Sequence, residues 1–481
     1  MLYKLHVAFA TLICYHFVVE NATIIFEEDM KKILALSLLV SLGFGYLSPS
    51  YAVLEKFSKK QKEQQQTTLD YINYDWWQNL GDNYLEGYIS QALQKNNDIK
   101  TAKLRVEQAK LNVTMTRADQ LPEFSISASP FLLKIPESTK STGTFAFPLQ
   151  ASYELDIFGK NWDKTKSSKK LLSSAQYQEQ VSDIAIVSLV GSTYYNVVKL
   201  DKIISLQEKL VEERKQIYEL QKVSNKEGIS STSDLILAEK NYVLAQNDLL
   251  EFKKNRENAL NALAVLIGDS AYNTNEYKRI SYDKIPSSFS IPKEISSEII
   301  VNRPDYKALE KQLEAKGIDI RVAKKEFLPT INILGILTFL ASSSMGTMDW
   351  ANTFSLIGAS ASLPIFTGFK RIANLKLNKN SYQQLLESYQ KTNLTAIQEV
   401  NDNLYNLKAD KEKFENNLKA LEIQKKDYNL SNSKFNKGII SKLDLLQQKE
   451  VLLYIEQLSV SSKIDCYIDK IGLYKATGAK V

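Results

Sequence analysis

The sequence predicts a mainly α-helical fold with a small β part, and three observations support this prediction. Only 17 Gly and 10 Pro punctuate 481 residues, so long stretches of the chain can stay helical. Apolar residues recur at steps of three and four along most of the chain, as they do on the buried face of a helix. Two short regions instead alternate apolar and polar residues, which is the period of a half-buried strand.

The chain also repeats itself at a nearly constant offset. Leu121-Pro122 and Leu328-Pro329 lie 207 residues apart, Phe158 and Phe366 lie 208 apart, and Gly228 and Gly438 lie 210 apart. Near-constant offsets over such a length indicate an internal duplication of about 210 residues.

Residues 1–52 are predicted to be an upstream segment followed by an export signal at 30–52. Met30-Lys31-Lys32 precedes an apolar run, and Ser50-Tyr51-Ala52 offers a cleavage site between small residues. The apolar stretch from Val7 to Val19 could instead be an anchor, but it is too short to span a bilayer. Either Met1 or Met30 could be the natural start.

Cleavage after Ala52 would remove both histidines, His6 and His16, and one of the two cysteines, Cys14. The predicted mature chain keeps Cys466 alone, which excludes Ser-His and Cys-His nucleophilic sites, histidine-ligated metals and disulfide frameworks. No pattern arranges carboxylates or lysines for catalysis, so we expect no enzyme activity and no cofactor. The net charge of +6 arises from intermixed signs, which favours solvated helix faces over nucleic-acid binding.

The predicted organisation follows the repeat. Residues 53–75 form a mobile leader, and residues 271–294 form a linker between two repeats. Each repeat should hold a helix, a β-hairpin and a helical hairpin. The first repeat is 76–270, with an amphipathic helix from Tyr84 to Ala118, a β-hairpin at 122–157 and a helical tip at 228–234; the second is 295–481, with a β-hairpin at 330–365 and a helical tip at 438–444.

The two β-hairpins would supply four strands of about ten residues, the length a tilted strand needs to cross a bilayer. Four strands cannot close a barrel, and an open edge in lipid leaves backbone groups unsatisfied. Several chains would therefore have to share one barrel. Aromatic residues toward the strand ends fit interfacial girdles or a core edge: Phe145, Phe147, Tyr153, Phe339, Trp350 and Phe354. The alternative is a soluble sheet packed on the helices.

The helices predicted beside these strands are unusually long. Trp162 to Asn225 contains no Pro, and as one helix it would reach about 95 Å. Ser233 to Ile267 returns with apolar residues at alternating steps of three and four, which predicts a coiled-coil seam. No globular core explains such lengths.

Each helical hairpin should turn at a Gly that takes positive φ and ends one helix, at Gly228 and at Gly438. Hydroxyl residues followed by Asp234 or Asp444 should then start the next helix.

Several motifs, in this order and spacing, resemble the TolC-like outer-membrane efflux protein family, and within it the NodT-type members that serve resistance pumps. They are Trp76-Trp77-Gln78-Asn79-Leu80-Gly81-Asp82, Tyr153-Glu154-Leu155-Asp156-Ile157-Phe158-Gly159-Lys160, Asn302-Arg303-Pro304-Asp305, Leu328-Pro329, Leu363-Pro364-Ile365-Phe366 with Gly368, and the two Gly-to-Asp turns. The resemblance covers about Tyr74 to Gly478.

The resemblance implies a homotrimer with a shared twelve-stranded barrel in the outer membrane of a Gram-negative bacterium and a periplasmic tunnel of coiled coils. Such a protein is a passive exit duct for drugs or toxic compounds, without catalytic activity. Its partners would be outer-membrane lipid, a periplasmic adaptor and an inner-membrane transporter. NodT-like features favour a proton-driven resistance pump as that transporter, and ATP-driven systems that export drugs or secrete proteins are the alternatives.

The resemblance also assigns roles to the hairpin tips. The adaptor would dock on Gly228, Ile229, Thr232, Gly438, Ile439 and Leu443. Asp444 falls at the position of an acidic constriction ring, where three carboxylates would raise one another's pKa or bind a cation, and Asp234 falls at the acceptor position of a gate-holding contact. Phe435, Ile440 and Gln447 replace residues that hold the gate or form a second acidic ring in some relatives. Alternatively, both aspartates only cap helices.

Two further expectations complete the sequence-based picture. Residues 48–53 contain no cysteine for a lipid anchor, so we expect an unlipidated protein held by its barrel. The competing function is an envelope coiled-coil scaffold or adhesin without channel activity, and an envelope hydrolase ranks third. Paired membrane-length hairpins favour the channel, because a scaffold does not need them.

Overall fold

A computed structural model describes residues 77, 80–133, 142–272, 274–287, 301–342 and 353–478. The chain divides into two units, Met1–Asp70 and Tyr71–Val481, and every described residue belongs to the second. The predicted signal and the whole predicted leader lie outside the described residues, as do Trp76 and Trp350.

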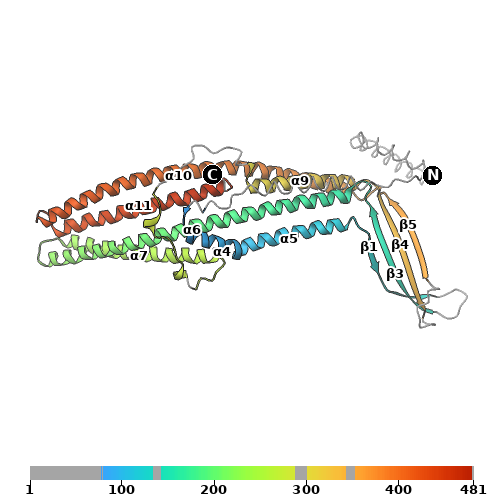
Figure 1. Cartoon of the computed structure of the whole chain (residues 1–481), viewed down its shortest axis with the longest axis horizontal. Coiled ribbons are helices and arrows are strands. Elements are labelled where there is room, and N and C mark those ends of the chain that lie inside the picture. The colour runs from blue at the N-terminus through green and yellow to red at the C-terminus, as the bar shows by residue number, and fades with distance from the viewer. Residues whose placement is uncertain are drawn as a thin grey trace, which may run out of the picture. The chain divides into compact units, whose positions relative to one another are not determined.

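Helices account for most of the described residues (Figure 1), as the sequence predicted. They are α4 (Asn83–Lys95), α5 (Asn97–Ala118), α6 (Lys160–Lys226), α7 (Thr232–Leu266), α9 (Pro304–Lys325), α10 (Lys370–Asn436) and α11 (Lys442–Ala476). Two short 3-10 helices, η2 (Thr274–Glu276) and η3 (Tyr282–Lys284), lie in the region predicted to link the repeats.

One antiparallel sheet contains all the described strands. These are β1 (Glu123–Ile126), β2 (Ser129–Leu133), β3 (Thr142–Leu155), β4 (Thr330–Ser342) and β5 (Thr353–Ser362). The order is β1-β3-β4-β5, with β2 also paired to β3. The central pair, β3 and β4, joins the two predicted repeats, so neither repeat forms the sheet alone.

The sheet has the four strand positions that the sequence predicted, and the first of them is divided into β1 and β2. Ile126 pairs with Leu149 and Ser129 pairs with Ala146, so both segments keep one register. The gap lies opposite Pro148, which has no N–H to donate to the ladder. The strand is therefore interrupted without a change in which residues share a face.

The predicted single helix from Tyr84 to Ala118 was wrong, because it divides at Asn96 into α4 and α5. Asn96 Oδ1 accepts hydrogen bonds from the backbone N–H groups of Asp98 at 2.8 Å and Ile99 at 3.2 Å, which caps α5. Its Nδ2 donates to the Leu266 carbonyl at 2.8 Å. Apolar periodicity continues across the break, so the pattern alone did not reveal it.

The long helices confirm the prediction for Trp162 to Asn225 and match between the two halves. Both α6 and α10 have 67 residues, and both α7 and α11 have 35. Helix α6 is long and apolar enough to cross a bilayer by composition, yet 56% of its most apolar window is buried inside the chain. It is the central helix of the bundle.

The helices lie side by side in a row. Helix α6 packs against α5 and α7 on one side and against α9 and α11 on the other, and α10 packs on α9 and α11. The row therefore runs α5-α6-α9-α10 toward the sheet and α7-α6-α11-α10 toward the hairpin tips (Figure 1).

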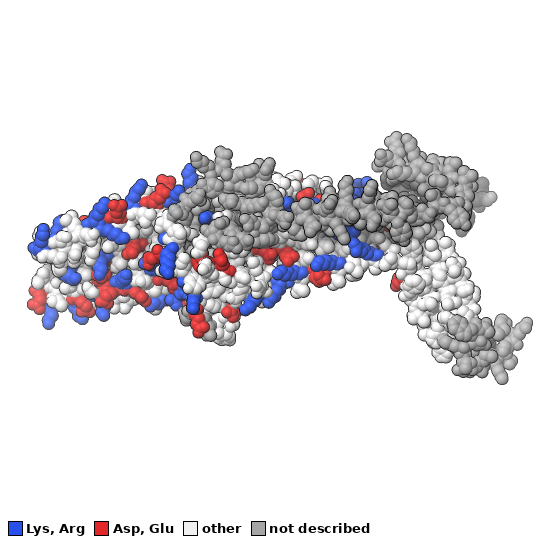
Figure 2. Space-filling view, viewed as in Figure 1, with Lys and Arg blue, Asp and Glu red and all other residues white. Residues whose placement is uncertain are grey.

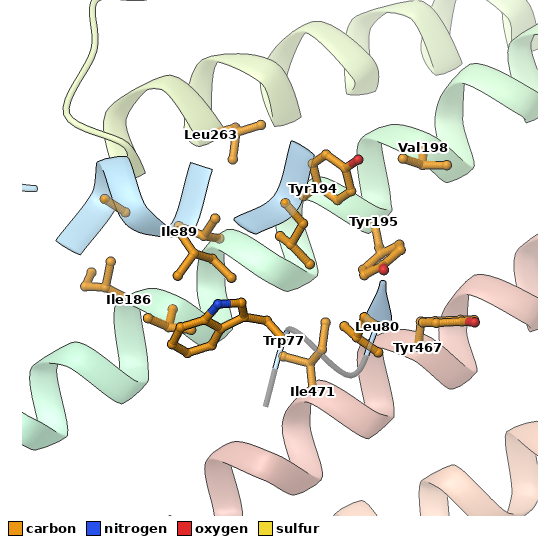
Figure 3. Packing of buried hydrophobic residues seen from close by; sticks show 14 of the residues in the cluster. Trp77, Leu80, Ile89, Ile186, Tyr194, Tyr195, Val198, Leu263, Tyr467 and Ile471 are labelled. Carbon is orange, nitrogen blue, oxygen red and sulfur yellow. The ribbon is translucent and has the colours of Figure 1, made fainter. Parts of the chain in front are cut away.

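The largest apolar cluster lies where α4, α6 and the ends of α7 and α11 meet. Figure 3 shows Trp77 and Leu80 packed with side chains of these helices. Its members include Ile89, Ile186, Tyr194, Tyr195, Leu263, Tyr467 and Ile471. Trp77 and Leu80 of the N-terminal motif are thus part of the core in the middle of the bundle.

Candidate functional site

Both helical hairpins turn in the way that the sequence predicted. Gly228 has φ 71° and Gly438 has φ 73°, the left-handed conformation that favours glycine. The next residue closes each turn, since Ile229 N–H donates to the Ser224 carbonyl at 2.8 Å and Ile439 N–H donates to the Lys434 carbonyl at 2.9 Å. The two tips therefore share one backbone geometry.

Each tip is followed by a reciprocal capping box. Ser231 and Asp234 form it at the start of α7, and Ser441 and Asp444 form it at the start of α11. In the second box, Asp444 Oδ2 accepts from the Ser441 hydroxyl at 2.7 Å and from its N–H at 2.9 Å. These two hydrogen bonds lower the pKa of Asp444 within a single chain. The acidic ring between three chains stays a prediction.

The other predicted tip residues differ in exposure. Ile229, Thr232, Ile439 and Gln447 are exposed, whereas Phe435, Ile440 and Leu443 are half-buried. Lys442 Nζ lies 5.5 Å from the centre of the Phe435 ring, a cation–π contact between α10 and α11. Leu443 packs on a small cluster of Ile217, Ala238 and Leu446. The first tip thus presents Ile229 and Thr232 to solvent, whereas the second tip combines exposed and packed side chains.

Sequence reasoning missed a charged layer between the two hairpins. Glu213 and Arg214 of α6 pair with Lys449 and Glu450 of α11. The Arg214 Nε to Glu450 Oε1 distance is 2.7 Å, and Glu213 is almost fully buried. These residues are 236 positions apart, so no local pattern could have found them. The layer fixes α11 on α6 between two apolar clusters.

A groove of about 450 Å³ runs beside this layer near the tips. Its walls come from α6 and the start of α11, and they combine apolar and charged side chains. They are Glu212, Lys215, Gln216, Glu219, Leu220, Val223, Lys442 and Leu446. An amphipathic helix needs such a surface for docking.

The sheet has two chemically different faces, because paired residues of an antiparallel ladder share a face. The apolar face carries Phe124, Ile126, Phe147, Leu149, Tyr153, Ile333, Leu337, Phe339 and Ile357. The mixed face carries Glu123, Ser125, Gln150, Ser152, Glu154, Asn332, Ile336, Phe354, Leu356 and Ser360. Figure 2 shows charged side chains spread over the helices, while the visible described surface of the sheet is almost uncharged.

A cavity of about 830 Å³ lies on the mixed face where the sheet meets the helices. Its charged lining comprises Asp119, Glu123, Glu154 and Lys164. Glu154 also pairs with Lys160 at 2.6 Å, which fixes the end of β3 to the start of α6. Both carboxylates that β1 and β3 contribute to the sheet point to this face, so water must reach it.

No described part of the chain brings three or more His, Cys, Asp or Glu side chains into a metal-binding group. Cys466 is buried, and burial raises the pKa of its thiol to about 12. A thiol held protonated in this way is a poor nucleophile.

Comparison with known proteins agrees with this architecture. The family model for outer membrane efflux proteins matches residues 88–269 and 295–479. A probable efflux pump outer membrane protein of Pseudomonas putida, TtgC, is 25% identical over 416 residues, which cover 84% of each chain. The cation efflux system protein CusC of Escherichia coli is 25% identical over 442 residues, covering 91% of this chain and 96% of CusC.

The structural comparison points the same way. The crystal structure of the Campylobacter jejuni CmeC outer membrane channel superposes with a TM-score of 0.77 at 25% identity, covering 85% of this chain and 88% of CmeC. The sequence-based identification, the outer-membrane location and the absence of an enzymatic role are therefore confirmed. The chain belongs to the outer membrane efflux protein family and is an outer-membrane efflux channel with a large periplasmic helical part.

Proposed function

We propose that three copies of this chain close one conduit, with a twelve-stranded barrel in the outer membrane and a helical tunnel in the periplasm. The observation that carries this proposal is a pair of free edges. The sheet ends at β1 and β5, and the helical row ends at α5 and α10. Strand β1 follows α5, and β5 precedes α10. A copy that pairs with a free strand would therefore also meet the free helix beside it.

Exposed apolar side chains on the two free helices support contact between copies. Helix α5 exposes Leu104, Leu111 and Met115, and α10 exposes Leu377, Leu394 and Tyr405. The α5 residues follow one another at steps of seven and four, so they form one stripe along the helix. In a trimer the α10 helix of a neighbouring copy would cover this stripe.

The two faces of the sheet support the same assembly. The apolar face fits hydrocarbon, whereas carboxylates on the mixed face require water. The mixed face would line the lumen of the barrel. Solutes would pass from the helical tunnel into the barrel through the charged cavity where the sheet meets the helices. The matching lengths of the long helices in the two halves support an origin by internal duplication.

Oxidative cross-linking across the free edges tests the trimer. In a Cys14→Ser background, Ser125→Cys on β1 is combined in turn with Ser360→Cys or Ser362→Cys on β5, which lie on the same face of the sheet. At least one pair should give covalent trimers on denaturing gels, and each single cysteine should give none, because closing a ring needs both edges. The same protein should form conducting pores in planar bilayers. A water-soluble monomer without cross-links would overturn the proposal.

We further propose that the groove between α6 and α11 receives a helical hairpin of a periplasmic adaptor, next to the predicted docking residues at the tips. Val223 is exposed on the groove wall, so Val223→Glu should abolish efflux-dependent resistance while the trimer persists. Val265 is equally exposed at the far end of α7, and Val265→Glu should leave resistance unchanged. Equal loss in both variants would contradict docking at the groove.

The energised partner is proposed to be a proton-driven resistance pump, with the duct itself passive. The relatives differ in what their names state: CusC belongs to a cation efflux system, and TtgC to an efflux pump. The test is the susceptibility of a strain that lacks this protein to organic drugs and to metal ions. We expect the strain to become sensitive to organic drugs. Sensitivity to metal ions alone would contradict the assignment.

A further inference from the structure

We propose that the two junctions between strand and helix form a phospholipid-contacting surface at the periplasmic boundary of the outer membrane. This junction surface consists of Ile157, Trp162, Ile365, Phe366 and Phe369. The inference rests on the outer-membrane placement of the sheet. It assigns lipid contact to residues outside the strands, where no strand pattern predicts it.

The first observation is the exposure of these side chains. Ile365 is 91% exposed, Phe366 76%, Trp162 63%, Phe369 59% and Ile157 45%. All of them lie between a strand end and the first turn of a long helix, in β3–α6 or β5–α10. Exposed apolar groups concentrated in one zone mark an interaction surface.

The second observation is backbone strain at Phe369. Its φ of 64° and ψ of 2° put it in the left-handed region, and it is the one non-glycine there among the described residues. Gly159, which precedes α6 as Phe369 precedes α10, has nearly the same φ of 68°. A bulky residue in this conformation is a real outlier, and such strain persists where a side chain has a function.

The strained residue does not enter the core of the chain. Its ring packs edge-to-face on Phe366 with 5.7 Å between ring centres, and Phe366 is itself exposed. The two rings form an exposed aromatic pair. Lys370 and Arg371 follow immediately, and cations beside aromatic rings suit the phosphate level of a bilayer.

The third observation is a shallow cavity of about 490 Å³ at the β3–α6 junction. Its lining includes Tyr153 of the apolar face together with Ile157, Phe158 and Trp162. Asp156 fixes this turn, because its Oδ2 accepts from the Trp162 N–H at 2.8 Å. The cavity thus extends the apolar face of the sheet past the end of β3.

Position in the fold decides between lipid and a second copy of the chain. The β5–α10 junction is at a free edge, where a neighbouring copy could cover it. The β3–α6 junction lies inside the row, flanked by β1 and α5 on one side and by β4 and α9 on the other. A neighbour at the edge does not reach it, whereas a surrounding leaflet contacts both junctions. Lipid is therefore the one occupant that explains both.

Site-directed fluorescence tests the proposal on the full chain. In the Cys14→Ser background the remaining Cys466 is buried and should not label. Trp162→Cys, Ile365→Cys and Phe369→Cys are each labelled with an environment-sensitive fluorophore and reconstituted into phosphatidylethanolamine–phosphatidylglycerol vesicles. Some of these vesicles contain phospholipid with a nitroxide near the carbonyl end of the acyl chain, and others carry it near the methyl end.

All three labels should lose fluorescence to the shallow nitroxide more than to the deep one. Lys169→Cys is the matched control, since Lys169 is exposed on α6 two turns beyond Trp162 and should not be quenched by either lipid. A blue-shifted label that neither lipid nor aqueous iodide quenches would place the residue between copies and overturn the proposal. Quenching by iodide alone would place it in water, with the same consequence.

Two controls separate this surface from the channel itself. Trimer formation and conductance are measured on the same samples, so normal pores without lipid quenching would overturn only the junction surface. If Phe369→Cys fails to assemble, Trp162→Cys and Ile365→Cys still decide the result, because neither replaces a strained residue.

Discussion

The Tyr194 hydroxyl donates a 2.7 Å hydrogen bond to Asp82 Oδ2 inside the central core. The other oxygen of Asp82 accepts from the Tyr84 and Leu85 N–H groups and so caps α4. The Tyr194 oxygen also accepts from the Ile280 N–H at 2.9 Å. One phenol therefore joins the start of α4, the middle of α6 and the segment that leads out of the first repeat.

Replacement of Tyr194 by Phe should destabilise the protein. The change leaves Asp82 Oδ2 and the Ile280 N–H without this partner in a buried site, which costs about 1–3 kcal/mol. Thermal unfolding followed by far-UV circular dichroism in detergent should show a lower Tm. Tyr84 is half exposed, so Tyr84→Phe is the control and should leave Tm nearly unchanged. Equal Tm values for both variants would contradict the role of the bond.

This network illustrates what the sequence could predict and what it could not. Local rules located the hairpin tips, since Gly228 and the Ser231–Asp234 pair follow backbone and capping preferences. Composition predicted the length of α6 through the absence of proline. Alternation predicted one apolar and one polar face for the sheet, and the structure shows that the second face also carries Ile336, Phe354 and Leu356. Each of these signals lies within one continuous stretch of the sequence.

Contacts between distant segments had no such signal. Asp82 was recognised as part of a motif, but its partner Tyr194 lies 112 residues away. The ion pairs between α6 and α11 and the groove beside them follow from how two hairpins pack. The breaks at Asn96 and opposite Pro148 were missed for another reason, because apolar periodicity continues through both.

Arg303 should be a second stability determinant that lysine cannot replace. Its side chain is 10% exposed; it holds Asp305 through two nitrogens at 3.0 and 2.7 Å, Glu399 at 2.8 Å and the Ala476 carbonyl at 2.7 Å. The guanidinium group therefore ties the start of α9 and the end of α11 to α10. A lysine ammonium group cannot reproduce this forked set of hydrogen bonds. Arg303→Lys should cost about 2 kcal/mol or more.

The matched control for that change is Arg321→Lys. Arg321 is 52% exposed and lies 3.5 Å from Asp163, so its replacement should change stability by less than about 0.5 kcal/mol. Denaturant unfolding of both variants gives the comparison. If Arg303→Lys were as stable as the unchanged protein, a positive charge alone would be sufficient at this position.

Asp469 should make the stability of the periplasmic helices depend on pH. Burial, followed by the neighbouring Asp410 of α10, raises the pKa of Asp469 to about 7. Asp465 raises it further and Lys413 opposes it, while Lys199 of α6 pairs with Asp465 at 3.0 Å. The folded state therefore binds a proton more tightly than the unfolded state does.

The direction of the pH effect follows from linkage. The stabilisation from protonated Asp469 is complete below about pH 4, the ordinary pKa of an aspartate, and is lost as the pH rises to about 7. Asp469→Asn should flatten the fall in Tm over this range. Asp248→Asn, at an exposed position on α7, should leave the slope as it is. If Tm of Asp469→Asn fell with pH as steeply as that of the unchanged protein, other titrating groups would cause the pH dependence.

Asp444 combines a capping role that the structure describes with the proposed acidic ring, and two substitutions separate them. Asp444→Asn removes the charge but keeps an oxygen that can accept from Ser441, whereas Ser441→Ala removes the cap and keeps the charge. Loss of the cap costs about 1 kcal/mol. If three carboxylates narrow the duct, Asp444→Asn should raise conductance in planar bilayers and weaken block by divalent cations, because the cation-binding charge is gone. Ser441→Ala should lower Tm slightly and leave divalent block intact. The reverse pattern, with Ser441→Ala altering block and Asp444→Asn not, would restrict Asp444 to its helix cap.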